Sequence, residues 1–281
     1  MLAFLTRRWA LSGLAFGAAV LFRPHLGVAC LVVAGGLLWA ERRWRPAVVF
    51  LLAALPGAAL LLVWNGMVYG RVTVTGGYSD VSAGGVGPGD FLLNLAGSLV
   101  SPERGLLVYT PVLLLAALGL PAAWRTAPPA VRILALAGVG YLASQLWLIR
   151  FSGGDGFFGY RTPLEALLLA APLLVLAGRA GAARTGPALA WALAAASVAI
   201  FSSTAFVPGG TSGADVNPWT HWSPAMVAGE YGLGRVVIGA LFGLAAVLLA
   251  GLVAARSRAE RRQASGLLPG LPALDRGGAP V

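Results

Sequence analysis

Long runs of apolar residues, separated by short joints rich in arginine, glycine and proline, set the pattern of this chain. A helix rises about 1.5 Å per residue, so a crossing of roughly 30 Å of hydrocarbon needs about 20 such residues. Inside lipid the backbone must satisfy its own hydrogen bonds, which favours helices over open strands. The pattern predicts an all-α, polytopic membrane protein with about eight transmembrane helices.

The predicted segments are apolar throughout and are bounded by polar joints. They are Trp9–Phe22, Pro24–Ala40, Ala47–Tyr69, Gly105–Trp124, Val131–Ile149, Pro163–Gly178, Ala188–Ser203 and Gly234–Ala255. Together they form a predicted transmembrane domain over residues 1–255, with outer loops at about 70–104, 150–162 and 204–232. Residues 256–281 are polar and contain proline and glycine, which predicts a disordered tail.

Composition supports the membrane prediction and fixes an orientation. Hydrophobic residues make up 58% of the chain and charged residues only 11%, whereas soluble domains carry about 25% charged residues. With all eight segments spanning and the N-terminus inside, 14 of the 20 basic residues fall on the inner side. Cytoplasmic loops collect such residues, so we expect a multi-pass cell-membrane protein with both termini cytoplasmic. This topology explains the net charge of +10 without a nucleic-acid partner.

The first two segments are joined by an unusually tight turn, Arg23-Pro24-His25. Trp9–Phe22 has 14 residues, or about 21 Å of helix, which is short of a full crossing. Non-helical backbone below the membrane surface survives only within protein or beside a wet cavity. The turn therefore predicts an outward-facing polar cavity lined in part by Arg23 and His25.

Phe91–Val100 has its own helical pattern within the first outer loop. Phe91, Leu92, Leu95 and Leu99 fall on one helical face, which favours a short helix lying in the outer membrane interface. The alternative is an ordinary loop with some apolar residues.

Candidate chemistry concentrates in the predicted outer loops. Asp155 can accept a proton or bind a metal ion, Arg161 can hold a phosphate through its planar fork, and Tyr160 can stack on a sugar. The alternative is a glycine-rich connector with one Asp–Arg pair. Arg104 either points into the cavity or pairs locally with Glu103. His221, between Trp219 and Trp222, is either a ligand-binding residue or part of an interfacial anchor.

Several chemistries find no support in the sequence. A phosphate-binding loop of the Walker type, a His-Glu-x-x-His zinc pair and a Gly-x-Ser-x-Gly nucleophile motif are all absent from it. Cys30 is the only cysteine, so no intramolecular disulfide can form.

Three stretches resemble the multi-spanning GT-C-type glycosyltransferases, which include protein O-mannosyltransferases and the lipid A aminoarabinose transferase. They are Gly13–Gly17 leading into Phe22-Arg23-Pro24, Ser101–Leu107 followed by Tyr109 and Pro111, and Gly153–Asp155 leading into Gly159-Tyr160-Arg161. The double glycine of the third stretch lies one residue further from Gly159 than the family pattern asks.

The resemblance implies transfer of a sugar from a polyprenyl-phosphate-linked donor to an acceptor on the extracytoplasmic face. It implies donor-binding roles for Arg23, Arg104 and Arg161, a polar role for Asp155, and either arginines or a divalent metal ion to stabilise the leaving phosphate. Family members keep their catalytic carboxylate in a first outer loop that has no counterpart here. We therefore expect the C-terminal part of such an enzyme, as a fragment, as a chain whose start is misassigned, or as a half that works with a missing N-terminal half, and assign no catalytic residue.

Two alternative functions fit the same sequence features. A non-enzymatic membrane protein, such as a transporter of an anionic or lipid-linked substrate, would use the same cavity and arginines. An inactive, truncated transferase would keep the motifs without the activity.

Overall fold

A computed structural model gives the fold of the chain, and it describes residues 1–74, 76, 88–149, 151, 159–203, 219, 225, 228–229 and 232–266. Across these residues the regular structure is helical and no strand occurs. The helices are α1 (Leu2–Leu5), α2 (Trp9–Phe22), α3 (Leu26–Glu41), α4 (Trp44–Tyr69), α5 (Pro88–Val100), α6 (Leu106–Tyr109), α7 (Leu113–Thr126), α8 (Pro129–Leu148), α9 (Leu164–Thr185), α10 (Pro187–Ser202) and α12 (Leu233–Gly266).

Three of these helices, α4, α8 and α9, are long and apolar enough to cross a membrane. Shorter apolar helices accompany them, among them α2, α3, α7 and α10. Many large apolar side chains are exposed, for example Phe22 at 81% and Met67 at 79%. An apolar surface of this extent is unfavourable in water and suits a lipid environment. The fold is therefore all-α and indicates association with a membrane.

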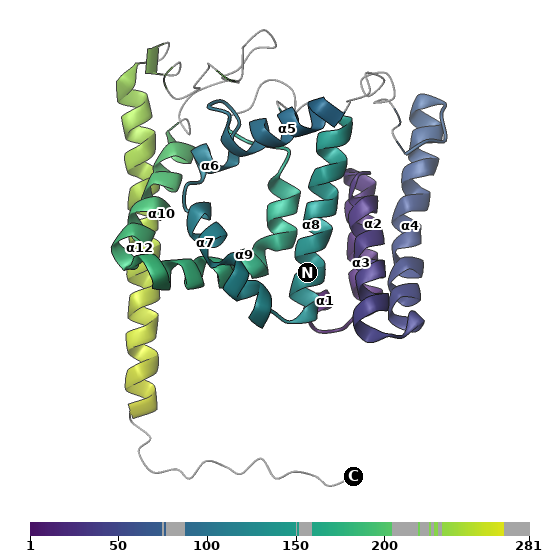
Figure 1. Ribbon diagram of the computed structural model, residues 1–281, viewed down its shortest axis with the longest axis horizontal. Coiled ribbons are helices and arrows are strands. Elements are labelled where there is room, and N and C mark those ends of the chain that lie inside the picture. The colour runs from purple at the N-terminus through teal and green to yellow at the C-terminus, as the bar shows by residue number, and fades with distance from the viewer. Residues whose placement is uncertain are drawn as a thin grey trace.

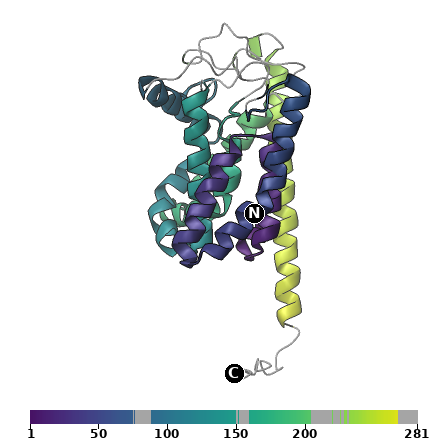
Figure 2. The ribbon, with the colours of Figure 1, turned by 90° about the vertical axis from the view of Figure 1, so that its right-hand side faces the viewer.

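The helix α5 lies across one end of the molecule, which we call the α5 end (Figure 1). The predicted helix at Phe91–Val100 is thus present and begins three residues earlier. Asn94, buried on α5, fixes it to the end of α8: its Nδ2 donates to the carbonyl of Leu146 at 2.9 Å, and its Oδ1 accepts from the amide of Phe151 at 3.2 Å. The opposite end carries the N-terminus, and α12 extends past it (Figures 1 and 2).

Helix packing depends on close backbone approach at glycines. At Gly13 and Gly17 of α2, a Cβ atom would collide with the backbone of α4, and at Gly57 of α4 it would collide with Gly17. Gly119 of α7 and Gly181 of α9 make the same kind of contact with the opposite helix. Small residues allow such contacts within membranes. The Gly13–Gly17 stretch is thereby explained by packing of α2 against α4.

The predicted span Gly105–Trp124 is wrong as a single helix. The structure has the short helix α6, a break at Thr110–Val112, and then α7. Pro111 lies at the break, and it lacks the backbone N–H that a continuous helix would use. The amide of Val112 instead donates a hydrogen bond to another element, to the Oγ of Ser197 on α10, at 3.1 Å.

The C-terminal helix also differs from prediction. α12 continues to Gly266, whereas the sequence predicts a disordered tail from residue 256. Alanine, arginine, glutamate and glutamine are good helix formers, and they dominate this stretch. A helix of 34 residues is about 51 Å long, which is longer than a single crossing.

Candidate functional site

The second and third stretches of the resemblance meet at the α5 end. The Arg104 guanidinium donates from Nη1 to the carbonyl oxygen of Gly159 at 3.1 Å, across 55 residues of chain. Next to this bond, the hydroxyls of Thr110 and Tyr160 are 2.8 Å apart. The sequence predicts roles for these residues separately, and the structure places them together.

Arg104 is buried at 2% exposure, so its guanidinium does not face an open cavity. Its Nη2 lies 3.2 Å from Oε1 of Glu103, which is also buried. The local fold positions this pair through Ser101. The Ser101 Oγ accepts a hydrogen bond from the amide of Arg104 at 3.1 Å, and the Ser101 carbonyl oxygen accepts one from the amide of Gly105 at 2.7 Å. Of the two sequence alternatives for Arg104, the pairing with Glu103 is the one that forms. The pair is buried and is not a surface ion pair, and its arginine also holds the backbone carbonyl of Gly159.

Tyr160 is anchored in an aromatic group. Its ring meets the ring of Phe201 edge-on, with centroids 5.2 Å apart, and Tyr109 contacts the same phenylalanine at 5.8 Å. Burial raises the pKa of the Tyr160 phenol, and the hydrogen bond with Thr110 opposes this with a smaller effect. Tyr160 therefore stays neutral at physiological pH and is 9% exposed, which leaves little of its ring to stack on a sugar.

A second cluster joins the α2–α3 turn to α8 and α9. Arg23 forms an ion pair with Glu165, in the first turn of α9, with Nε and Oε1 3.1 Å apart. Tyr141 of α8 faces the Glu165 carboxylate and interacts electrostatically with both Arg23 and Arg161. The exposed Arg161 precedes Glu165 by four residues. We call Arg23, Tyr141, Arg161 and Glu165 the Arg23–Glu165 cluster.

This cluster has the composition of an anion site with a resident counter-ion. It holds two arginines and one carboxylate, and nearly half of the Arg23 side chain, 46%, is exposed. A planar guanidinium binds phosphate oxygens through parallel N–H donors. An anion reaching Arg23 would meet Glu165 as a competitor for the same cation.

His25 lies in the same turn, just before α3. Burial lowers its pKa, and the positive charge of Arg23 lowers it further. A neutral imidazole is thus the resting form at pH 7, and it can give or accept a hydrogen bond beside Arg23. It does not add a third cation.

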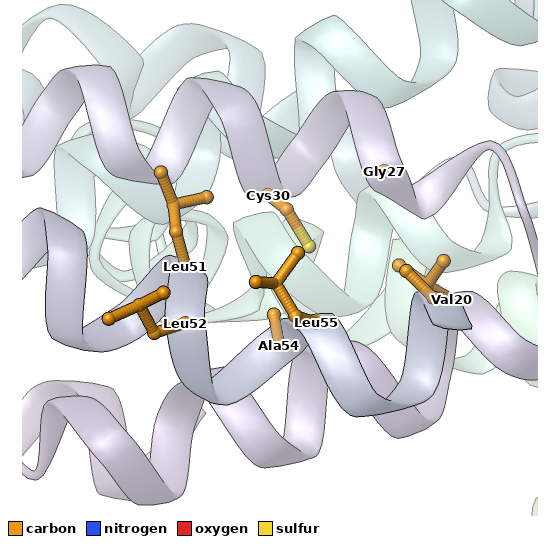
Figure 3. Close-up of a pocket in the computed structure, with 8 residues that line it drawn as sticks. Val20, Gly27, Cys30, Leu51, Leu52, Ala54 and Leu55 are labelled. Carbon is orange, nitrogen blue, oxygen red and sulfur yellow. The ribbon is translucent and has the colours of Figure 1, made fainter. Parts of the chain in front are cut away.

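A cavity of about 250 Å³ lies between α2, α3 and α4 and is apolar (Figure 3). Arg23 and His25 do not line it, so it is not the polar cavity that the sequence predicts. Another cavity, of about 220 Å³, lies toward the opposite end and is lined in part by Arg7, Trp9 and Glu41.

Asp155 and His221, two predicted binding residues, lie outside the described residues. Within the described part of the chain, no group of three His, Cys, Asp or Glu side chains is placed to hold a metal ion. Sequence reasoning gave Glu165 and Tyr141 no role in the site. The four-residue spacing of Arg161 and Glu165 at a helix start was the signal available for Glu165. Nothing local singles out Tyr141.

Comparisons of the chain with protein-family models, with curated proteins and with solved structures find no match. The functional argument therefore depends on the residues and on their geometry.

Proposed function

We propose that this protein is a membrane glycosyltransferase, or the donor-binding part of one, that uses a polyprenyl-phosphate-linked sugar. The observation that carries the proposal is the Arg23–Glu165 cluster, in which two arginines from different elements, Arg23 and Arg161, both interact with Tyr141. Lipid phosphate is the ligand that such a cation pair at the edge of an apolar protein suits best. The resemblance of the Ser101–Pro111 and Gly159–Arg161 stretches adds the sugar donor.

The proposed topology has eight spans, α2, α3, α4, α7, α8, α9, α10 and the apolar part of α12, with both termini cytoplasmic. The arginine distribution supports this orientation. The α5 end then faces outward, with α5 in the membrane interface, so the cluster meets acceptors on the extracytoplasmic side.

In the proposed reaction an acceptor hydroxyl forms a bond to the anomeric carbon of the sugar. The bond between that carbon and the phosphate oxygen breaks, and the polyprenyl phosphate leaves with the electron pair. Arg23 and Arg161 stabilise the charge that develops on the leaving phosphate. The hydroxyl proton passes to a carboxylate base, which we do not assign in this chain.

The test is direct binding of polyprenyl phosphate to the full chain in detergent. We expect Arg23→Ala and Arg161→Ala each to weaken binding by about tenfold or more, because a hydrogen bond to a charged group contributes about 1.5–3 kcal/mol. Arg7→Ala is the matched control, since Arg7 is an exposed arginine paired with Glu41 at 3.4 Å at the opposite end. If Arg23→Ala and Arg161→Ala bind polyprenyl phosphate as tightly as the native chain and Arg7→Ala do, the proposal is overturned.

The orientation has its own test. In a Cys30→Ala background, a membrane-impermeant maleimide added to intact cells should label Arg161→Cys and not Thr126→Cys, which lies at the opposite end of the fold. Labelling of Thr126→Cys alone would reverse the topology and remove the extracytoplasmic site.

A further inference from the structure

The apolar cavity between α2, α3 and α4 is open to the side of the molecule. One wall comes from α4, where Leu52 and Leu55 are 60% and 56% exposed. Cys30 points from α3 toward α4, and Leu55 points back toward α3 (Figure 3). The residues that line the cavity include Val20, Gly27, Cys30, Leu51, Leu55 and Ala58. We call this space the α2–α4 groove.

The chemistry of the groove selects a hydrocarbon. Its described lining holds no charged residue and no hydrogen-bonding side chain other than the weakly polar thiol of Cys30. A sugar or a headgroup buried there would lose hydrogen bonds to water and gain none. The surface around it is apolar as well, since Leu31 of α3 and Leu60 of α4 are 66% and 53% exposed. The groove is therefore continuous with the surface that suits lipid.

The dimensions of the groove suit a short stretch of one hydrocarbon chain. Leu51 and Ala58 are seven residues apart on α4, or about 10 Å along the helix, which is less than half the thickness of a bilayer's hydrocarbon core. A volume of about 250 Å³ is enough for part of one hydrocarbon chain and too small for an additional helix. An acyl chain of a phospholipid in a single leaflet meets both limits.

The α2–α3 hairpin lies between α4, which forms one wall of the groove, and α8, which carries Tyr141 of the Arg23–Glu165 cluster. α2 and α3 both pack against α4 on the groove side, and α3 packs against α8 on the other. Glu165 and Tyr141 belong to the α8–α9 side. Arg23 itself lies in the turn of the hairpin, three residues after Val20 of the groove, so a donor lipid is the competing occupant.

We infer that the α2–α4 groove is a binding site for one acyl chain of a bilayer phospholipid. The bound chain fills the space that Gly27 leaves on α3, where a Cβ atom would meet no atom within 4 Å. It thereby fills a gap among three helices that are otherwise in contact, since α2 packs closely on the same stretch of α4, with Gly17 against Ala54 and Gly57. The site is independent of the proposed transfer activity.

The test is photo-crosslinking of the full chain in detergent with phosphatidylglycerol that carries a diazirine on its acyl chain. We expect saturable labelling that mass spectrometry maps to the peptide containing Cys30 and to the middle of α4. Gly27→Leu should reduce this labelling by about tenfold, because displacing even two methylene groups costs about 0.8 kcal/mol each and 1.4 kcal/mol is a factor of ten.

Gly35→Leu is the matched control. Gly35 lies on the same helix, is also open where a Cβ would be added, and does not line the groove, so labelling should equal that of the native chain. If Gly27→Leu fails to fold, Ala58→Leu fills the groove from α4, and the exposed neighbour Ala59→Leu is its control.

Two results would overturn the inference. One is equal labelling of Gly27→Leu, Ala58→Leu and the native chain. The other is competition by polyprenyl phosphate at concentrations tenfold below those at which unlabelled phosphatidylglycerol competes, which would give the groove to the donor lipid. Neither result changes the outcome of the phosphate-binding test on Arg23 and Arg161.

Discussion

Arg23 in the α2–α3 turn and Glu165 at the start of α9 form an ion pair of 3.1 Å that joins two segments 142 residues apart in the chain. The pair lies beside Tyr141 and within electrostatic reach of Arg161. It neutralises one cation of the proposed phosphate site while no phosphate is bound. In the proposed function, this relationship gives Glu165 control over anion binding at Arg23.

Replacing Glu165 with glutamine should therefore strengthen the binding of polyprenyl phosphate. The amide keeps the size of the side chain but no longer competes as an anion for Arg23. Exposed ion pairs contribute about 0–1 kcal/mol, so we expect affinity to rise about two- to fivefold, measured by titration in detergent. Glu41→Gln, which removes the partner of Arg7 at the opposite end, should leave affinity unchanged. Loss of binding in Glu165→Gln would instead show that the carboxylate is needed to orient Arg23.

Replacing Arg104 with alanine should destabilise the fold. Arg104 and Glu103 are 2% and 4% exposed, and removal of one partner leaves a buried charge without compensation, at a cost of about 3–5 kcal/mol. The bond to Gly159 is lost as well. Thermal unfolding in detergent would measure the change.

The double variant Glu103→Met with Arg104→Met is the informative companion. Replacement of both charges by apolar side chains of similar volume is often neutral, so most of the lost stability should return. A double variant as unstable as Arg104→Ala would contradict the assignment of a buried, mutually compensated pair.

The sequence was sufficient for the helical class and for most helix positions, because apolar runs of this length leave few alternatives. It also predicted the turn at Arg23 and the short helix over Phe91–Val100. It failed at Thr110–Val112, where Pro111 interrupts the helix and the Val112 amide finds its partner in Ser197, 85 residues away. Apolar content alone does not show where a long segment stops being helical.

The site was predictable only as separate residues. Arginine type and loop position marked Arg23, Arg104 and Arg161, but burial separates them: Arg104 supports the Gly159 segment, whereas Arg23 and Arg161 lie in the exposed cluster. Glu165 and Tyr141 become visible only when α8 and α9 pack together. Long-range contacts of this kind carry no local pattern.

Helix packing gives a third prediction, for which the chain supplies a control. Gly57→Ala should lower thermal stability, because the added Cβ would collide with the backbone of Gly17 on α2, and overpacking costs about 1–3 kcal/mol. Gly178→Ala, within α9, has no atom within 4 Å of the added Cβ, so it should be neutral or stabilising by up to about 1 kcal/mol. Thermal unfolding of both variants in the same detergent checks the contrast. Equal melting temperatures would argue against close α2–α4 contact.

The pH dependence of stability should reveal His25. Its pKa is lowered in the folded protein from an ordinary value of 6.5, first by burial and then by Arg23. The unfolded chain then binds more protons than the folded one as pH falls below about 6.5, so stability decreases on acidification. In His25→Gln this contribution is absent, and the melting temperature should fall less between pH 7.5 and pH 5.5 than it does in the native chain. Because Arg23 is a cause of the shift, Arg23→Gln should also reduce the pH dependence while leaving His25 in place. A native chain and a His25→Gln variant with parallel melting curves across this range would show that His25 is as well hydrated in the fold as in the unfolded chain.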